Sequence, residues 1–361
     1  MYISPLDAAK RAIDTMMRKF DAADLPPKGR FHYHQGVFLS GVYETYLLTG
    51  EKKYFDYMRA YVDSLIGEDG SVGGHDAGQL DDIQPGILLY PLYALTKDEK
   101  YKKALDFLVN EEWNHPRTPE GGFWHKTWYP NQMWLDGLYM GGPIMAQYAK
   151  EFGRTEFYEL VEQQAVIMEK RTRDPETGLL YHAWDYSKEA EWADKETGLS
   201  PEFWGRSIGW VGVAILNDLD FFPKDSPAVP VLKDIAKRLM NALIPFQSAD
   251  GRWYQVVNKP DAPDNWLENS CSCLYTAALA KGVYTGVLPA SMLENAKRGY
   301  KGVIESIGVD ENGGLQIGSV CVGTGVGNYT HYINRPTSVN DLHGVGAFLI
   351  MCAECARAGI E

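Results

Sequence analysis

Asp136 is the one acidic residue in an apolar and aromatic stretch at 121–147, GGFWHKTWYPNQMWLDGLYMGGPIMAQ. Its aromatic and basic neighbours there are Trp124, His125, Lys126, Trp128, Tyr129 and Trp134. An ionised carboxylate is costly to bury without a partner, so such a group gains hydrogen-bond donors or holds a proton at a raised pKa. A proton-holding acid beside aromatic rings suits an enzyme that acts on sugars, and we expect the pKa of Asp136 to be raised.

The same position has a plainer interpretation, because Asp136 comes just before an apolar run with helical spacing. Asp is a favoured N-cap residue, since its carboxylate accepts hydrogen bonds from N–H groups of the first helical turn. From this stretch alone, both interpretations stay open.

Helical periodicity runs through the whole chain and predicts twelve helices, the first with Leu6 and Ile13 on its apolar face. The expected segments are 6–22, 36–49, 52–66, 84–96, 98–112, 134–152, 155–171, 204–221, 228–247, 268–284, 289–306 and 340–358. Gly50, Gly153 and Gly286 fall between paired segments, where glycine commonly forms a left-handed C-cap. The helices therefore form hairpins with short turns.

Longer loops with a turn glycine join these hairpins and mark six irregular repeats. The marker glycines are Gly29, Gly70, Gly122, Gly178, Gly251 and Gly314. The repeats average about 60 residues, longer than the roughly 33 to 47 residues of common helical solenoids. Closing six hairpins into a ring buries each hairpin on both sides. We predict one all-α domain over residues 1–361, an (α/α)6 barrel or six-hairpin toroid, with an open solenoid as the alternative.

In such a ring, the loops before the inner helices meet at one end and line a funnel. The candidate residues in these loops are His32, Tyr33, His34, His75, Asp76, Asp81, Asp82, His125, Asp136, Tyr181, His182, Trp184, Trp204, Arg206, Trp210, His331, Arg335, Asp341 and His343. The set includes every histidine except His115, so we expect these side chains to converge on one pocket.

Several of these residues also have structural interpretations. Either Asp81 or Asp82 could cap the following helix while the other faces the funnel. Arg206 could stack on an aromatic ring of the core or clamp a carboxylate with two hydrogen bonds. His32 and His34 could begin a metal site, but no third ligand lies near them in the sequence, and we expect no metal and no other cofactor.

The composition excludes some classes of partner and location. A formal net charge of −13 disfavours nucleic acid and anionic membrane surfaces. No run of about 18 apolar residues predicts a membrane span. The N-terminal segment is charged and amphipathic, unlike a secretion signal, and the five cysteines fit reduced packing thiols. We therefore expect a cytoplasmic protein.

Five segments in register carry a resemblance that covers nearly the whole chain. They are LDDIQPG (80–86), QMWLDGLYMGGP (132–143), WGRSIGW (204–210), VCVGTGVGN (320–328) and NDLHGVGAFLIM (340–351). This set resembles glycoside hydrolase family 105, the unsaturated rhamnogalacturonyl hydrolases. The (α/α)6 barrel of that family agrees with the twelve helices expected from periodicity.

The resemblance implies an unusual glycosidase reaction. Pectin lyases leave a sugar acid with a C4=C5 double bond at the non-reducing end, and enzymes of this family remove that sugar by hydrating the vinyl ether. One Asp gives a proton to C4 and helps to activate the water that attacks C5, after which the hemiketal opens and the aglycone leaves. By position in WLDGLYM, this residue is Asp136.

The resemblance also implies a binding site for a small unsaturated oligosaccharide. The second pocket carboxylate would be Asp81 or Asp82, with Asp81 favoured. The remaining residues that match lining positions are Tyr33, His125, His182, Trp204, Arg206 and Trp210. Arg206 is then a candidate for the carboxylate of the substrate and the tryptophans for stacking on its ring. Ser207, Ile208 and His343 depart from the family pattern and bear on fine substrate preference.

Other functions remain open at this point. An unsaturated glucuronyl substrate from a glycosaminoglycan or another polysaccharide would use the same chemistry. A non-catalytic carbohydrate-binding toroid would leave Asp136 as a helix cap. An epimerase on the same barrel would depend on histidines as acid and base, and an ordinary glycosidase on two carboxylates.

Overall fold

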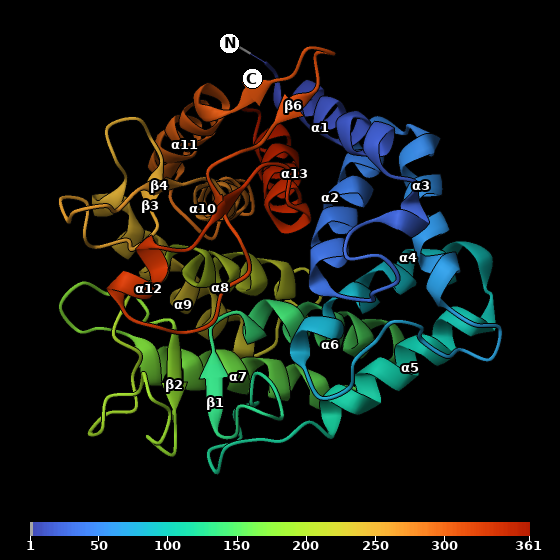
Figure 1. Ribbon diagram of the computed structural model, residues 1–361. Helices are drawn as coiled ribbons and strands as arrows, with labels where there is room; N and C mark the ends of the chain where they lie inside the picture. Colours follow the sequence, from blue (N-terminus) through green and yellow to red (C-terminus); the bar gives the residue numbers. More distant parts are fainter. Residues whose placement is uncertain (1–2) are drawn as a thin grey trace.

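The computed structural model describes residues 3–361, whose helices form a closed double ring (Figure 1). The inner ring consists of α2 (Tyr33–Thr49), η3 (Gln84–Leu88) with α4 (Leu89–Thr96), α6 (Gly137–Phe152), α8 (Gly205–Asp218), α10 (Asn269–Tyr284) and α13 (Leu342–Arg357). The outer ring consists of α1 (Pro5–Lys19), α3 (Lys52–Leu65), α5 (Glu99–Trp113), α7 (Glu156–Thr172), α9 (Ala228–Leu243) and α11 (Leu293–Ser306). Each inner helix packs on its two inner neighbours and on at least one outer helix.

The ring closes where the two ends of the chain meet. The N-terminal helix α1 packs on the C-terminal helix α13, and α13 packs on α2 (Figure 1). The sixth hairpin is therefore built from opposite ends of the sequence. The inner helices α8, α10 and α13 are buried along almost their whole length, whereas α1 buries one face with Ala8, Ile13 and Met16. These observations confirm the predicted (α/α)6 barrel.

The predicted helices correspond to observed ones, with differences at their boundaries. Gly50 and Gly153 are left-handed C-caps with φ of 69° and 74°, and Gly286, one residue after the C-cap of α10, has φ of 73°. The segment expected at 84–96 begins as the 3₁₀ turn η3, which has Pro85 in its first turn, and continues as α4. The short helix α12 (Tyr329–Ile333) was not predicted and lies in the last long loop.

Short antiparallel strands order the loops before the inner helices: the first pair joins two neighbouring loops, and each of the other three pairs lies within a single loop. The pairs are β1 (Gln132–Trp134) with β2 (Ala183–Asp185), β3 (Trp253–Tyr254) with β4 (Leu267–Glu268), β5 (Gly308–Val309) with β6 (Leu315–Gln316), and β7 (Val320–Cys321) with β8 (Thr337–Ser338). Isolated bridges join Gln79 to Lys126 and Trp204 to Val256. These links position the loops that carry most of the candidate site residues.

The structure also bears on the cysteines and on membrane-spanning helices. All five cysteines are buried and unpaired with one another, as expected for packing thiols. In residues 3–361, no helix is both long enough and apolar enough to cross a membrane.

Ring closure requires a glycine where α13 approaches α2. A Cβ atom at Gly346 would lie 2.6 Å from the backbone N of Phe38, and backbone atoms cannot move aside as a flexible side chain can. Gly318 is a suitable comparison, because a Cβ atom there would meet only Val339 Cγ2, at 3.5 Å.

We expect Gly346→Ala to lower the free energy of unfolding by about 1 to 3 kcal/mol, the usual cost of overpacking a closely packed contact. Gly318→Ala should leave it within about 0.5 kcal/mol, as surface substitutions usually do. Urea unfolding followed by circular dichroism measures both. Equal stability of the two variants would contradict the importance of this helix contact.

Candidate active site

Asp136 lies between β1 and α6, with its backbone already helical at φ −55° and ψ −35°. It occupies the N-cap position of α6, yet its side chain makes no capping hydrogen bond. Instead, Asp136 Oδ2 lies 3.2 Å from His182 Nε2. The carboxylate therefore points away from its own helix, and the simple capping interpretation does not describe this side chain.

His182 is fully buried and links Asp136 to the loop that contains α12. The hydroxyl of Tyr332 accepts a hydrogen bond from Gly327 N–H at 3.2 Å and lies 2.6 Å from His182 Nδ1. Burial raises the pKa of Tyr332 well above its ordinary value, so its O–H stays protonated and donates to Nδ1. His182 Nε2 then carries the proton and donates to Asp136.

Aromatic rings form two walls beside Asp136. Trp134 is stacked between His125, with ring centroids 4.5 Å apart, and Tyr129, at 5.1 Å. On the other side, the ring of Trp204 lies parallel to Tyr332, with an interplanar angle of 11°. Flat apolar faces of this kind suit the apolar faces of a sugar ring.

The neighbouring acids Asp81 and Asp82 point to different surroundings. Asp81 Oδ2 lies 2.6 Å from Lys126 Nζ, and its other oxygen lies 3.5 Å from His125 Nε2. Although burial opposes ionisation, the two basic groups lower the pKa of Asp81 to about 2. Asp82 instead accepts hydrogen bonds from Arg30 and from the backbone N–H of Asp76, and burial raises its pKa to about 7.

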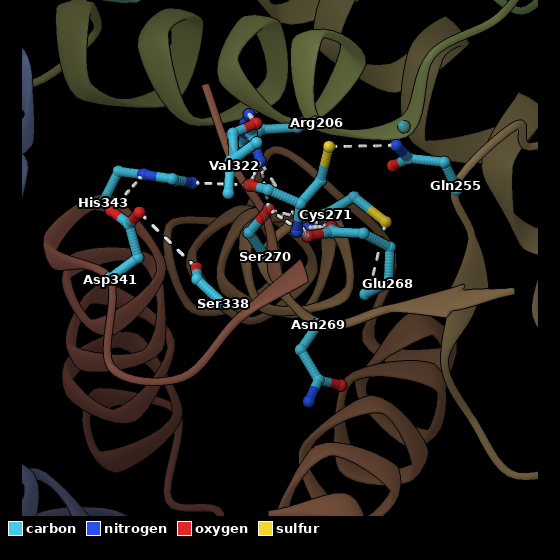
Figure 2. Close-up of polar contacts among 12 residues, drawn as sticks. Arg206, Gln255, Glu268, Asn269, Ser270, Cys271, Val322, Ser338, Asp341 and His343 are labelled. Carbon is cyan, nitrogen blue, oxygen red and sulfur yellow. Dashed lines mark hydrogen bonds and ion pairs between the residues drawn. The ribbon is translucent and has the colours of Figure 1, made fainter. Parts of the chain in front are cut away.

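Arg206 is a buried cation whose donors hold the loop after β7. It donates to the carbonyl oxygens of Cys321, at 2.6 Å, and Val322, at 2.9 Å, as Figure 2 shows. A third hydrogen bond reaches Ser270 Oγ at 3.3 Å, and Glu268 lies 3.9 Å away. The guanidinium thus fixes the position of the backbone that continues into Gly323–Gly325.

These side chains surround a cavity of about 290 Å³. It is lined by His32, Tyr33, His34, Asp81, His125, Lys126, Tyr129, Trp134, Asp136, Met140, Trp204, Arg206, Gly323, Thr324, Gly325 and Arg335. The lining comes from loops before several inner helices, but it includes only part of the set that was expected to converge. Outside it are His75, Asp76, Asp82, Tyr181, His182, Trp184, Trp210, His331, Asp341 and His343. The volume is comparable to that of small-ligand sites.

Comparison with known proteins identifies the family. A sequence model described as Glycosyl Hydrolase Family 88 matches residues 8–358. The structure of a glycoside hydrolase from family 105 of C. acetobutylicum ATCC 824 is 37% identical, covers 97% of this chain and 99% of that chain, and superposes with a TM-score of 0.92. The chain belongs to the glycoside hydrolases of families 88 and 105.

Two further similar proteins are hydrolases whose names give different substrates. The unsaturated rhamnogalacturonyl hydrolase YesR of Bacillus subtilis (strain 168) is 28% identical over 269 residues, which cover 71% of this chain and 73% of that protein. The unsaturated glucuronyl hydrolase of Bacillus sp. GL1, responsible for the degradation of glycosaminoglycan, is 16% identical with a TM-score of 0.71 over 100% of this chain and 98% of that chain. The latter likeness establishes the shared fold alone.

Six of the nine predicted site residues of this glycoside hydrolase line the cavity, and three do not. Tyr33, Asp81, His125, Trp204 and Arg206 line the cavity, as does Asp136. His182 lies directly behind Asp136, and Asp82 lies behind Asp81. Trp210 does not line the cavity, because it is buried one helical turn further along α8 and stacks on Tyr139 at 4.5 Å.

Some cavity residues were absent from the predicted site. Trp134, Tyr129 and Lys126 belong to the aromatic stretch around Asp136, and their sequence proximity was a usable signal. Thr324 comes from the last long loop, which the fold brings beside Asp136. Arg335 of the same loop was among the residues expected to converge, and it does line the cavity. The glycine-rich segment there was noticed as part of the family resemblance, without a role for its residues.

The expected direction of the pKa shift at Asp136 was wrong. Burial does raise the pKa, but the hydrogen bond from His182 and the electrostatic interactions with His182, His125 and Arg206 outweigh burial. The pKa of Asp136 therefore lies below its ordinary value, and the free hydrolase carries this group as a carboxylate at neutral pH.

One group of side chains in the described chain could hold a metal ion. Ligand atoms of His34, Asp341 and His343 lie within 4.8 Å of one another. The third ligand that the sequence did not offer to His34 thus comes from the opposite end of the chain. In this hydrolase the nitrogens also have protein partners: His343 Nδ1 lies 2.7 Å from Asp341 Oδ1, and His343 Nε2 lies 3.0 Å from the oxygen of Cys321.

Removing the hydrogen-bond donor to Asp136 should raise the pKa of this acid. If protonated Asp136 is the active form, kcat/KM falls as pH rises through its pKa in the free enzyme. We expect His182→Leu to move this alkaline limb to higher pH, measured as a pH profile of kcat/KM on an unsaturated disaccharide.

His115→Leu is the matched control, because His115 is also buried but donates through Nε2 to the carbonyl oxygen of Trp124, outside the cavity. Its alkaline limb should coincide with that of the unchanged protein. An unmoved limb in a folded His182→Leu variant would contradict the assignment of His182 to the pKa of Asp136.

Proposed function

We propose that this hydrolase removes a terminal unsaturated galacturonyl residue from rhamnogalacturonan-derived oligosaccharides by hydrating the C4=C5 double bond. The observation that carries the proposal is Asp136, a carboxylate without a capping role that lines an aromatic-walled cavity and receives a hydrogen bond from buried His182. The relation to the rhamnogalacturonyl hydrolase YesR favours the galacturonyl substrate.

The second cavity carboxylate supports single-acid chemistry. An ordinary glycosidase pairs its nucleophile or base with a carboxylic acid whose pKa is raised. Asp81 Oδ2 forms an ion pair with Lys126 Nζ at 2.6 Å, and this fixed cation keeps Asp81 ionised, so Asp81 is unsuited to proton donation near neutral pH. Asp82 has the raised pKa but does not line the cavity. Asp136 is left to act as both acid and base.

In the proposed reaction, the proton of Asp136 moves to C4 and a water oxygen forms a bond to C5. The water returns a proton to Asp136, so the carboxyl is regenerated and the double bond is lost. The hemiketal at C5 then opens, which releases the aglycone and a keto sugar. One substrate and one water thus give two products, with no change in oxidation state overall.

The low pKa of Asp136 in the free protein requires that binding helps it to take up a proton. An unsaturated sugar acid carries a carboxylate at C5 and displaces water from the cavity. Both effects disfavour a second negative charge nearby and raise the pKa of Asp136. His182 stays hydrogen-bonded in either state of the acid, because Asp136 retains a carbonyl oxygen that accepts.

The test is the loss of ultraviolet absorbance of an unsaturated galacturonyl-rhamnose disaccharide. We expect the unchanged protein to abolish the absorbance and Asp136→Asn to be slower by about 100-fold to 10,000-fold, the usual contribution of a general acid or base. Asp56→Asn, on the exposed face of α3, is the control and should react at the normal rate.

Each other outcome rejects a named part of the proposal. Equal rates for the unchanged protein and Asp136→Asn would keep the reaction and remove Asp136 from it. No loss of absorbance on the galacturonyl substrate, with loss on an unsaturated glucuronyl disaccharide, would establish the alternative substrate. No loss on either would favour a non-catalytic carbohydrate-binding role.

We also expect activity to survive treatment with a metal chelator. The proposed reaction uses protons and water, and both ring nitrogens of His343 already lie beside protein oxygens. The rate before and after dialysis against EDTA measures this. Complete loss that only a divalent metal restores would instead make the His34, Asp341 and His343 cluster a functional metal site.

A further inference from the structure

The cavity has three cationic side chains, and two of them have partners within the protein. Lys126 forms an ion pair with Asp81 at 2.6 Å and donates to Gln79. Arg206 donates to two carbonyl oxygens and lies near Glu268. Neither cation offers its full hydrogen-bonding capacity to a bound anion.

Arg335 is the third cation, and its surroundings differ. It lies between α12 and β8, is half-buried, and donates through Nη2 to the carbonyl of Gly323. Its Nε is buried without a hydrogen-bond partner, and among residues 3–361 no carboxylate forms an ion pair with it. Arg335 lines the cavity, and the N–H groups at the half-buried end of its guanidinium that Gly323 does not occupy can donate to a bound acceptor.

The segment around Arg335 is held in place by the backbone. Cys321 pairs with Thr337 in the β7–β8 ladder, and Val322 N–H donates to the carbonyl of Pro336 at 3.1 Å. The hydrogen bond to Gly323 fixes one edge of the guanidinium. Such a fixed fork is preorganised for an oxyanion, because little side-chain freedom is lost on binding.

Arg335 acts at a different part of the cavity from Asp136. The charges that act most strongly on Asp136 are those of His182, His125 and Arg206. A cation that bound the carboxylate at C5, next to the reacting bond, would be expected among these near neighbours. Arg335 is instead associated with Gly323, Thr324 and Gly325, at the wall formed by the last loop.

We propose that Arg335 binds an oxyanion on the leaving part of the substrate, a carboxylate or sulfate on a sugar that follows the unsaturated residue. This inference rests on the proposed function and narrows the substrate class to acidic oligosaccharides longer than the reacting unit. Arginine binds carboxylate and sulfate groups through paired N–H donors in the same planar geometry.

The test compares substrates with a neutral and an acidic leaving part. One is the unsaturated galacturonyl-rhamnose disaccharide, and the other is the matching tetrasaccharide, which carries a second galacturonate. We expect Arg335→Gln to lower the ratio of kcat/KM for the tetrasaccharide over the disaccharide by about tenfold or more, through KM, as loss of a charged hydrogen bond predicts. Arg335→Lys should restore part of the ratio.

A third arm separates the sources of the oxyanion. An unsaturated disaccharide with a sulfated leaving sugar should show the same loss in Arg335→Gln if sulfate is the natural group, and little selectivity if carboxylate is. Arg154→Gln, at an exposed arginine beyond the cavity, should leave every ratio unchanged.

An equal fall in kcat/KM on all substrates would overturn the inference and make Arg335 a structural residue or a ligand of the reacting sugar itself. Unchanged ratios would overturn it as well. If the unchanged protein acts on no unsaturated substrate, the proposed function fails, and calorimetric binding of a saturated acidic tetrasaccharide still decides the role of Arg335. Equal affinity of the unchanged protein and Arg335→Gln would then reject it.

Discussion

The cavity depends on the satisfaction of one buried charge, the guanidinium of Arg206. Glu268, with no exposed surface, lies 3.9 Å from it and accepts hydrogen bonds from Ser270 Oγ and from the backbone N–H of Cys321 (Figure 2). The arginine and the glutamate thus bind the same short strand, one at its carbonyls and one at its N–H. Leaving either charge unpaired would cost about 3 to 5 kcal/mol. The two charged side chains therefore hold the loop around Cys321 against the ends of α8 and α10.

The helical ring was predictable because buried helices carry apolar residues at helical spacing in the sequence. The convergence of loops at one end follows from that ring, and so does the neighbourhood of Asp136 and His125. The partnership of Asp136 with His182 was not predictable in detail, because it depends on the register of β1 and β2, which are three residues each. The pKa of Asp136 was predicted in the wrong direction for the same reason. The apolar sequence around Asp136 suggested burial and a raised pKa, but the groups that lower the pKa come from distant segments.

Adjacent residues also had roles that the sequence left open. Asp81 and Asp82 both belong to a 3₁₀ turn, in which successive side chains point about 120° apart. Only one of them can face the cavity, and the motif alone did not decide which. The structure directs Asp81 to Lys126 and Asp82 to Arg30. Trp210 shows the opposite case. This tryptophan is close to Arg206 in the sequence, but it lies one helical turn further along α8 and packs in the core on Tyr139, away from the cavity.

If the substrate is an acidic sugar, as proposed above, this acidic protein must overcome repulsion at long range with a few cations at short range. With a net charge of −13, attraction can come only from groups inside the cavity, where charges interact more strongly than in water. Asp81 and Asp136 offset part of that attraction while both are ionised. On the proposed mechanism, proton uptake by Asp136 removes one of the two negative charges as the anionic sugar binds. Binding and protonation then favour each other, so the reacting acid is charged in the free protein and gains its proton together with the substrate.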